Sequence, residues 1–486
     1  MKGLFARKPL QLIMQEPEVE HHKLKRVLGP WGLISLGIGV IIGAGIFVLS
    51  GQAAANYAGP AIVLSFVLSA IGCALAGLCY AEFASMIPIS GSAYTYAYAT
   101  LGEFLAWIIG WDLVLEYLFG ASTVAVGWSG YVVSFLRDFN INIPVVFSQA
   151  PLSYSVTGGW HATGAILNCP AIFIVGLMTT LLVIGIRESA RFNNGIVIIK
   201  LIVIVLFIGV GVFFIKFANW SPFLPDNTGQ FGSFGWSGVV RGAGVIFFAY
   251  IGFDAVSTAA QEARNPQRDM PIGILGSLAI CTIVFILMTG VLTGIMKYTS
   301  LAVPDPVAVA VNAAGPGIAW LRPFIKIGAI AGLSSVVLVL LMAQPRVFFS
   351  MARDGLLPAG FARVHPRFKT PYIPTILTGC TAVIVSGLFP INILGELVSI
   401  GTLLAFVIVC IGVLVLRYRH PEIPRVFRTP WVPFVPIAGA LVTMLQMAFL
   451  PVDTWIRLFV WMAVGIVIYF FYSRKHSRLR ILSPEE

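Results

Sequence analysis

Charged residues are scarce in this chain. Only 10% of its 486 residues are Asp, Glu, Lys or Arg, whereas 58% are hydrophobic. A typical soluble domain carries about 25% charged residues, so the composition excludes a soluble globular protein. A membrane-spanning helix needs roughly 20 apolar residues. The chain therefore predicts an all-α integral membrane protein with room for many spans.

The residues that usually build metal or redox sites are few and scattered. The six histidines lie in expected tails and loops, without an HExxH or HxxxD pattern, and the six cysteines lack CxxC or CxxH spacing. Most of the cysteines fall in apolar runs, where they behave as small packing residues. We therefore expect no metal, no cofactor and no enzymatic activity.

The N-terminal segment also lacks a targeting pattern. Residues 1–30 have mixed charge, without the basic, apolar and small-residue order of a signal peptide. We expect a cytoplasmic tail over 1–30, with a short amphipathic helix near residues 3–14, and a second cytoplasmic tail over 473–486.

Apolar runs of spanning length occur twelve times. The basic residues between them test the topology, because cytoplasmic loops are enriched in Lys and Arg. With the N-terminus inside, 23 basic residues fall on inside segments and four on outside segments. This distribution predicts twelve spans in the plasma membrane with both termini cytoplasmic, and it explains the net charge of +11 without nucleic acid. The predicted spans are about 31–56, 60–87, 101–135, 165–185, 192–215, 237–260, 272–295, 322–350, 372–390, 394–416, 431–450 and 455–472.

Two of these spans have glycine-rich interruptions at mid-depth. The first contains GIGVIIGAGIF (37–47), with Gly43-Ala44-Gly45 at its centre, and the sixth contains Ala249-Tyr250-Ile251-Gly252. Small residues can simply allow close helix packing in membranes. Two interruptions five spans apart, in spans of opposite direction, instead indicate an inverted repeat with broken helices. We expect repeats over 31–215 and 237–416, followed by two further helices over 431–472.

A broken helix exposes backbone groups that need polar partners. Free N–H groups of Ala44, Gly45 and Ile46 would face the first break, and N–H groups at a helix N-terminus favour an anion. Free carbonyls of Phe248, Ala249 and Ile251 would face the second break and favour a cation. Opposed donors and acceptors suit a zwitterion, so the pattern predicts an α-amino acid with its carboxylate on the first broken span and its ammonium on the sixth.

Several stretches resemble one transporter superfamily. The segment GVIFFAYIGFDAVSTAAQEARNPQRDMPIGI (244–274) is similar to the corresponding stretch of the amino acid–polyamine–organocation superfamily, and within it to the bacterial branch of the cationic amino acid transporter family. The resemblance covers nearly the whole chain. Further matching stretches are GAGIFVLSGQAAANYAGPA, YAEFASMIPISGSAYTYAYATLGE, GWDLVLEY, HPRFKTPYIP and RHPEIPRVFRTPWVPFVP.

The resemblance carries expectations about fold and site. It implies the five-plus-five inverted repeat of the sodium-coupled leucine transporter type, with alternating access to the site. It places the substrate carboxylate on the amides of Gly43, Ala44 and Gly45, and the ammonium on carbonyls of the Phe248–Ile251 region. It also implies that Phe248 is the aromatic gate that closes over the substrate.

Lys200 lies near the centre of the fifth span. A lysine at that depth costs at least ~2.5 kcal/mol on insertion scales, so it must pair with carbonyls or carboxylates or lose its proton. Its ammonium can occupy the place that Na⁺ takes in related transporters, and the resemblance to proton-coupled members implies this role. We expect proton symport without Na⁺, with Ser334 and Ser335 as polar neighbours of Lys200, although these hydroxyls also fit a Na⁺ site.

Buried carboxylates are the other candidates for proton coupling. Asp254 follows the second break, and Glu116 lies deep in the third span; Asp112, one turn before Glu116, is expected nearer the surface. Glu82 is expected near the inner end of the second span, where it can cap or brace an inner gate. Intramembrane carboxylates usually mark substrate or proton pathways, but the sequence does not distinguish Asp254 from Glu116.

The backbone pattern specifies an amino acid but not its side chain. We expect a broad-range transporter of L-amino acids, such as alanine, that also accepts arginine and lysine. Strict uptake of cationic amino acids and amino acid exchange remain alternatives. A channel or a membrane-embedded sensor or enzyme is the alternative from another class, although neither repeated pore loops nor a soluble signalling domain is evident. The expected partners are the amino acid, the proton and the bilayer.

Overall fold

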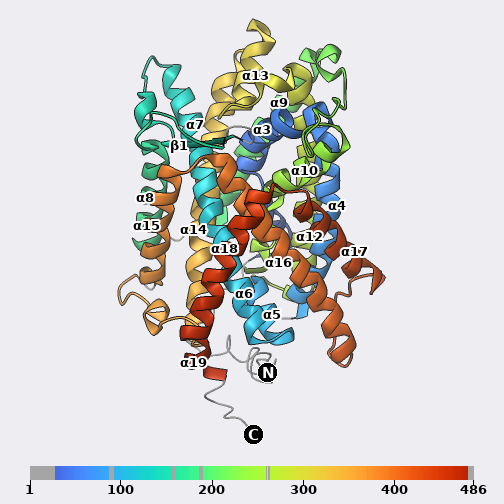
Figure 1. Ribbon diagram of the computed structural model, residues 1–486, viewed down its shortest axis with the longest axis vertical. Helices are drawn as coiled ribbons and strands as arrows, with labels where there is room; N and C mark the ends of the chain where they lie inside the picture. The colour runs from blue at the N-terminus through green and yellow to red at the C-terminus, as the bar shows by residue number, and fades with distance from the viewer. Residues whose placement is uncertain are drawn as a thin grey trace.

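A computed structural model describes residues 28–86, 92–155, 159–184, 190–258, 260, 263–368 and 370–479. Of the expected tails over 1–30 and 473–486, residues 1–27, including the amphipathic helix near residues 3–14, and residues 480–486 lie outside these ranges. The described chain is predominantly helical (Figure 1), as the apolar composition predicts.

The first broken stretch and the helices after it occupy the N-terminal part. Helix α2 (Pro30–Ile41) is followed by the π-helical turn η4 (Gly45–Leu49), α3 (Ser50–Ala53) and η5 (Ala54–Ala58). A Pro at the start of α2 has no backbone N–H to leave unsatisfied. The next elements are α4 (Ile62–Met86), α5 (Ser92–Thr100), α6 (Glu103–Val114), η7 (Leu115–Phe119), α7 (Gly120–Arg137), α8 (Cys169–Ile184) and α9 (Ala190–Gly211).

The second half begins with another interrupted stretch. Helix α10 (Gly235–Ile246) runs into the 3₁₀ turn η11 (Phe247–Tyr250), and α11 (Ala255–Thr258) follows after a gap. The later elements are α12 (Pro266–Ile295), α13 (Pro306–Ala314), α14 (Leu321–Arg353), α15 (Tyr372–Leu388), α16 (Ile391–Arg419), α17 (Phe434–Ala448), α18 (Val452–Ile468), η16 (Tyr469–Ser473) and α19 (Arg474–His476).

The long helices pack in two groups. Helix α12 lies against both α4 and α2, and α10 also packs on α4. In the other group, α14 lies against α7, and α15 lies against α8. Helix α16 contacts members of both groups and packs on α17. The interrupted stretches therefore run through the interior of the helical assembly, where backbone that departs from a regular helix is shielded from lipid.

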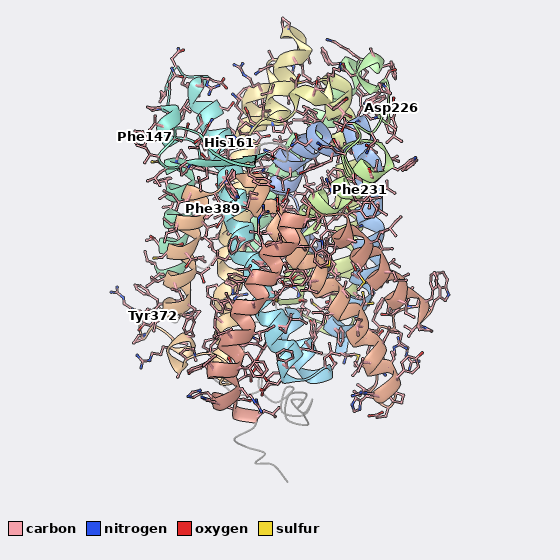
Figure 2. All side chains as sticks on the ribbon, in the orientation of Figure 1. Phe147, His161, Asp226, Phe231, Tyr372 and Phe389 are labelled. Atoms are coloured by element: carbon pink, nitrogen blue, oxygen red, sulfur yellow. The ribbon has the colours of Figure 1, made fainter. Side chains whose placement is uncertain are left out.

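A small hairpin and several short helices lie at one end of the molecule. Strands β1 (Leu152–Ser155) and β2 (Gly159–Ala162) are antiparallel, with Ser153 opposite His161. Figure 2 shows His161 of this hairpin at the same end as Asp226 and Phe231 of the α9–α10 connection. The opposite end carries α5 and α19 (Figure 1). The sequence does not predict α5, α13 or the hairpin, because short elements outside the apolar runs show little hydrophobic periodicity.

Many helices are suited to a bilayer. In the described ranges, seven helical stretches are long and apolar enough to cross a membrane, and four shorter apolar helices accompany them. One long stretch, Gly45–Met86, contains the end of the first predicted span and the second predicted span up to Met86. The chain is a multi-pass membrane protein.

Candidate functional site

The first interruption falls where the glycine cluster predicts it. Helix α2 ends at Ile41, Ile42 has an extended ψ of 94°, and η4 starts at Gly45. The first N–H groups of a helix have no acceptor within the helix, so the amides of Ala44, Gly45 and Ile46 lie where such donors occur. All three residues are fully buried.

The second interruption lies directly opposite. The 3₁₀ turn η11 ends at Tyr250, Ile251 has an extended ψ of 135°, and Gly252 has a φ of +111°. A positive φ of this size is readily adopted only by glycine. The carbonyl of Phe248 accepts a hydrogen bond from the Ile251 amide at 3.2 Å. One of the predicted cation-facing carbonyls therefore already has a backbone partner.

Two glycines allow the interrupted stretches to touch. A Cβ atom on Gly45 would overlap the backbone of Ala249, and a Cβ on Gly252 would overlap Val40. In each interrupted stretch, a glycine without a Cβ atom therefore allows the other stretch to approach closely. Gly43 differs, because a Cβ there would lie 3.3 Å from the side chain of Val336 and meet no backbone. The fold brings the predicted donor segment and the predicted acceptor segment together.

Phe248 lies beside this contact and is buried, with 5% of its surface exposed. The adjacent rings of Phe247, Phe253 and Phe406 form an aromatic cluster, with Phe247 and Phe406 centroids 5.3 Å apart and Phe253 and Phe406 centroids 4.9 Å apart. The position of Phe248 is compatible with a side chain that covers a ligand at the break.

Lys200 reaches the first interruption from α9. Its ammonium donates hydrogen bonds to the carbonyl oxygens of Gly39 at 2.5 Å and Ile42 at 3.0 Å, and the side chain is fully buried. These carbonyls belong to the C-terminal end of α2, where the helix dipole is negative and favours a cation. The lysine therefore binds backbone carbonyls, which is one of the pairings that its position in the span predicts.

The two expected serine neighbours of Lys200 have other hydrogen bonds. Ser334 accepts a hydrogen bond from Trp128 Nε1 at 2.8 Å and donates to the Ile330 carbonyl, while Ser335 donates to the Gly332 carbonyl at 2.8 Å. The α14 residue that packs on the lysine stem is Gly332, where a Cβ would lie 3.3 Å from Lys200 Cδ. This glycine gives the lysine room to pass α14.

The buried carboxylates converge on the other side of the second interruption. Tyr117 donates a hydrogen bond to Asp254 Oδ2 at 2.9 Å, and the nearby Glu116 is 1% exposed, with neither carboxylate oxygen hydrogen-bonded within the described residues. Glu116 and Asp254 come from predicted spans three and six, so the fold assembles them. Two nearby carboxylates repel when both are charged, which makes the charge state of the pair important.

Asp112 corrects one expectation. It is 1% exposed, although the sequence reading placed it nearer the surface. The reason is that α16 covers it: a Cβ on Gly401 would lie only 3.1 Å from Asp112 Oδ1. Asp112 therefore lies in the same buried column as Glu116, one helical turn away.

Glu82 forms an ion-pair network that the sequence does not predict in detail. Its oxygens lie 2.8 Å and 2.9 Å from Arg417 nitrogens and 3.2 Å from Arg425 Nε, and they accept a hydrogen bond from the Thr429 amide at 2.8 Å. The network ties α4 to the end of α16 and to the segment between α16 and α17. This segment is the Pro/Arg-rich stretch that carried part of the resemblance.

The comparisons with known proteins identify the family of the chain. The sequence model of the amino acid permease family matches residues 28–471. The methylthioribose transporter of Bacillus subtilis is 48% identical over 479 residues, covering 99% of this chain and 100% of that protein. The branched-chain amino acid permease BcaP of the same organism is 46% identical over 481 residues, with the same coverage.

A plant relative extends the comparison. Cationic amino acid transporter 4, vacuolar, of Arabidopsis thaliana is 37% identical over 422 residues, covering 87% of this chain and 68% of that protein. The family expected from the sequence is confirmed, and these relatives are permeases or transporters. The chain belongs to the amino acid permease family, within the amino acid–polyamine–organocation superfamily.

Proposed function

We propose that the protein is a proton-coupled symporter of L-amino acids that works by alternating access. The observation that carries the proposal is the contact between the two interrupted stretches, η4 and η11. The backbone amides at Gly43–Ile46 and the backbone carbonyls at Phe248–Ile251 belong to two buried stretches that touch at Gly45 and Ala249. An amino acid carries a carboxylate for the donors and an ammonium for the acceptors.

The hydrogen bonds of Lys200 support proton coupling. Its ammonium donates hydrogen bonds to carbonyl oxygens at the end of α2, beside the proposed carboxylate site. A lysine can lose its proton when buried, so protonation of Lys200 can be linked to the backbone that binds substrate. Asp254 and Glu116 are the proposed partners in moving the proton toward the other side of the membrane.

The helix contacts support an inverted repeat. With α2 counted as the first span, the second span (α4) packs on the seventh (α12). The third span (α7) packs on the eighth (α14), and the fourth (α8) packs on the ninth (α15). A pseudo-two-fold axis between repeats over 31–215 and 237–416 would produce such contacts. Helices α17 and α18 are then the eleventh and twelfth spans.

The orientation follows from the basic residues. We propose that both termini are cytoplasmic and that the protein lies in the plasma membrane. The Glu82 network would then lie at the cytoplasmic end, and the β1–β2 hairpin would face outside.

A broad amino acid range fits the site and the relatives. The backbone groups at the break contact only the part that all α-amino acids share. The named relatives include a branched-chain amino acid permease and a cationic amino acid transporter. We propose that the protein takes up neutral amino acids such as alanine and accepts cationic ones.

Methylthioribose is a second candidate substrate, because a relative with 48% identity is named for its transport. Methylthioribose has hydroxyl groups and no carboxylate or ammonium. It would use the same backbone donors and acceptors without their charge preference.

Cross-competition separates these candidates. We expect purified protein in proteoliposomes to take up radiolabelled L-alanine, with uptake inhibited by excess leucine and arginine and unaffected by methylthioribose. Absence of alanine uptake together with uptake of radiolabelled arginine would leave strict cationic uptake. Uptake of radiolabelled methylthioribose without uptake of either amino acid would replace the amino acid proposal with the sugar. Protein-free liposomes provide the background.

A further inference from the structure

A cavity of about 320 Å³ lies between α3, α10 and the start of α16. Ligand pockets begin at roughly this volume. The cavity is lined by Leu49 and Val245, among others. Leu49 follows Gly45 by four residues and Val245 precedes Phe248 by three, so the cavity lies about one helical turn from the proposed substrate site. We call it the α3–α10 cavity.

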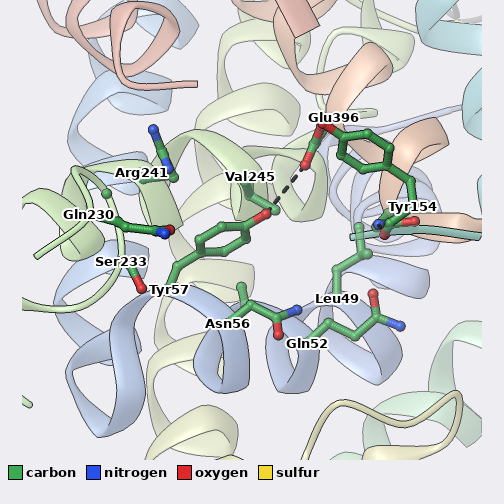
Figure 3. Close-up of a pocket in the computed structure, with 13 residues that line it drawn as sticks. Leu49, Gln52, Asn56, Tyr57, Tyr154, Gln230, Ser233, Arg241, Val245 and Glu396 are labelled. Atoms are coloured by element: carbon green, nitrogen blue, oxygen red, sulfur yellow. Dashed lines mark hydrogen bonds between the residues drawn. The ribbon is translucent and has the colours of Figure 1, made fainter. Parts of the chain in front are cut away.

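Opposite charges line the α3–α10 cavity. Figure 3 shows Arg241 of α10 on one side and Glu396 of α16 on the other, with the ring of Tyr57 between them. Arg241 has no carboxylate partner in the described part of the chain. Its Nε donates to the Phe449 carbonyl at 3.0 Å, and the guanidinium lies 5.7 Å from the centroid of Phe231. An arginine has five N–H donors, so four are left for a ligand.

Glu396 keeps one oxygen nearly free. Its Oε2 accepts hydrogen bonds from Thr454 at 2.9 Å and Arg457 at 3.3 Å, whereas Oε1 accepts only a long bond of 3.3 Å from Tyr57 (Figure 3). A carboxylate oxygen can accept more than one hydrogen bond. An ammonium can therefore bind Oε1, with or without displacement of the tyrosine hydroxyl.

Amide side chains complete the lining. Gln52 and Asn56 are four residues apart on one helical face, and both line the cavity. Neither amide has a hydrogen-bond partner among the described residues. They can contact either charged group of a small polar ligand, and Figure 3 shows them beneath the Tyr57 ring.

The charge arrangement selects the ligand class. Arg241 offers unused N–H donors to a carboxylate, and Glu396 Oε1 offers an acceptor to an ammonium although Oε2 is already paired with Arg457. A molecule with both a carboxylate and an ammonium satisfies both walls. We propose that the α3–α10 cavity is a second amino acid site, with the carboxylate on Arg241 and the ammonium on Glu396 Oε1, occupied before the substrate reaches the helix break.

This inference rests on the proposed amino acid transport, and the stoichiometry of binding tests the two separately. We expect two molecules of radiolabelled L-alanine to bind each purified protein. Arg241→Gln should weaken one of the two sites by about 10- to 100-fold, the loss expected for a charge-assisted hydrogen bond. Arg241→Lys should retain most of the affinity. Arg322→Gln, a change at an exposed arginine paired with Asp138, should retain two sites.

A second variant isolates the cavity. With Gly43→Leu filling the break, one alanine should remain bound and should disappear when Arg241→Gln is added. Excess propionate or ethylamine should not displace it. Unchanged binding in Arg241→Gln, or displacement by propionate alone, would overturn the cavity proposal. Full binding in Gly43→Leu with loss in Arg241→Gln would instead contradict the break as the transport site while supporting the cavity.

Discussion

Replacement of Gly43 by leucine is expected to abolish amino acid uptake while the protein stays folded, whereas leucine at Gly45 would overlap the Ala249 backbone and should lower the melting temperature as well. A Cβ at Gly43 would lie 3.3 Å from the Val336 side chain and meet no backbone, so we expect a leucine there to be accommodated by movement of Val336 and to obstruct the neighbouring amides. A carboxylate there would lose charge-assisted hydrogen bonds that are each worth about 1.5–3 kcal/mol. Uptake of radiolabelled alanine and the melting temperature of the purified variants measure the two effects.

The two glycines should differ when the added side chain is small. Gly45→Ala places a methyl group against the backbone of Ala249, whereas Gly43→Ala meets a side chain that can move. We expect Gly45→Ala to impair uptake more strongly. Gly209→Leu is the matched control, because it lies in α9 with open space around it, and it should transport normally. Normal uptake by Gly43→Leu and Gly45→Leu would contradict binding at the break.

Replacement of Lys200 is expected to separate proton coupling from substrate exchange. Lys200→Met removes the ammonium from the Gly39 and Ile42 carbonyls, and it should abolish uptake driven by a pH gradient. Exchange of internal for external amino acid should persist, because exchange needs no net proton movement. Lys200→Arg retains a permanent charge, so it should also lose proton-driven uptake but remain as stable as the wild type.

A second buried lysine provides the control for Lys200. Lys326 is 2% exposed and donates to the Ser134 carbonyl and to Asp138, at 2.8 Å and 2.7 Å. Arg322 also lies near Asp138, so the carboxylate keeps a cation after Lys326→Met. That variant should retain proton-driven uptake. Retention of proton-driven uptake by Lys200→Met would show that Lys200 has a structural role alone.

The sequence predicted the backbone features of the site better than its side-chain network. The glycines at Gly43–Gly45 and Gly252 predict positions where a regular helix fails, and α2 ends at Ile41 and η11 at Tyr250, close to these glycines. The partners of Lys200 were predicted as a chemical class, carbonyls or carboxylates, but not as Gly39 and Ile42. The backbone conformation at the end of α2 decides which carbonyls point toward α9.

Long-range pairs were beyond the sequence. Neither Arg241 nor Glu396 was singled out, because nothing local in the sequence shows that α10 and α16 face one cavity. Glu82 was expected to brace an inner gate, yet its partners Arg417 and Arg425 follow more than 330 residues later. Such pairs depend on which distant helices pack together, and a single sequence does not specify that packing.

Uptake driven by an imposed pH gradient tests the central claim most directly. Proteoliposomes with purified protein, acidic outside and neutral inside, are assayed in Na⁺-free buffer for accumulation of radiolabelled L-alanine. The account predicts accumulation above the external concentration, which collapses when a protonophore dissipates the gradient. A strict requirement for Na⁺, or uptake that never exceeds equilibration, would contradict proton-coupled symport.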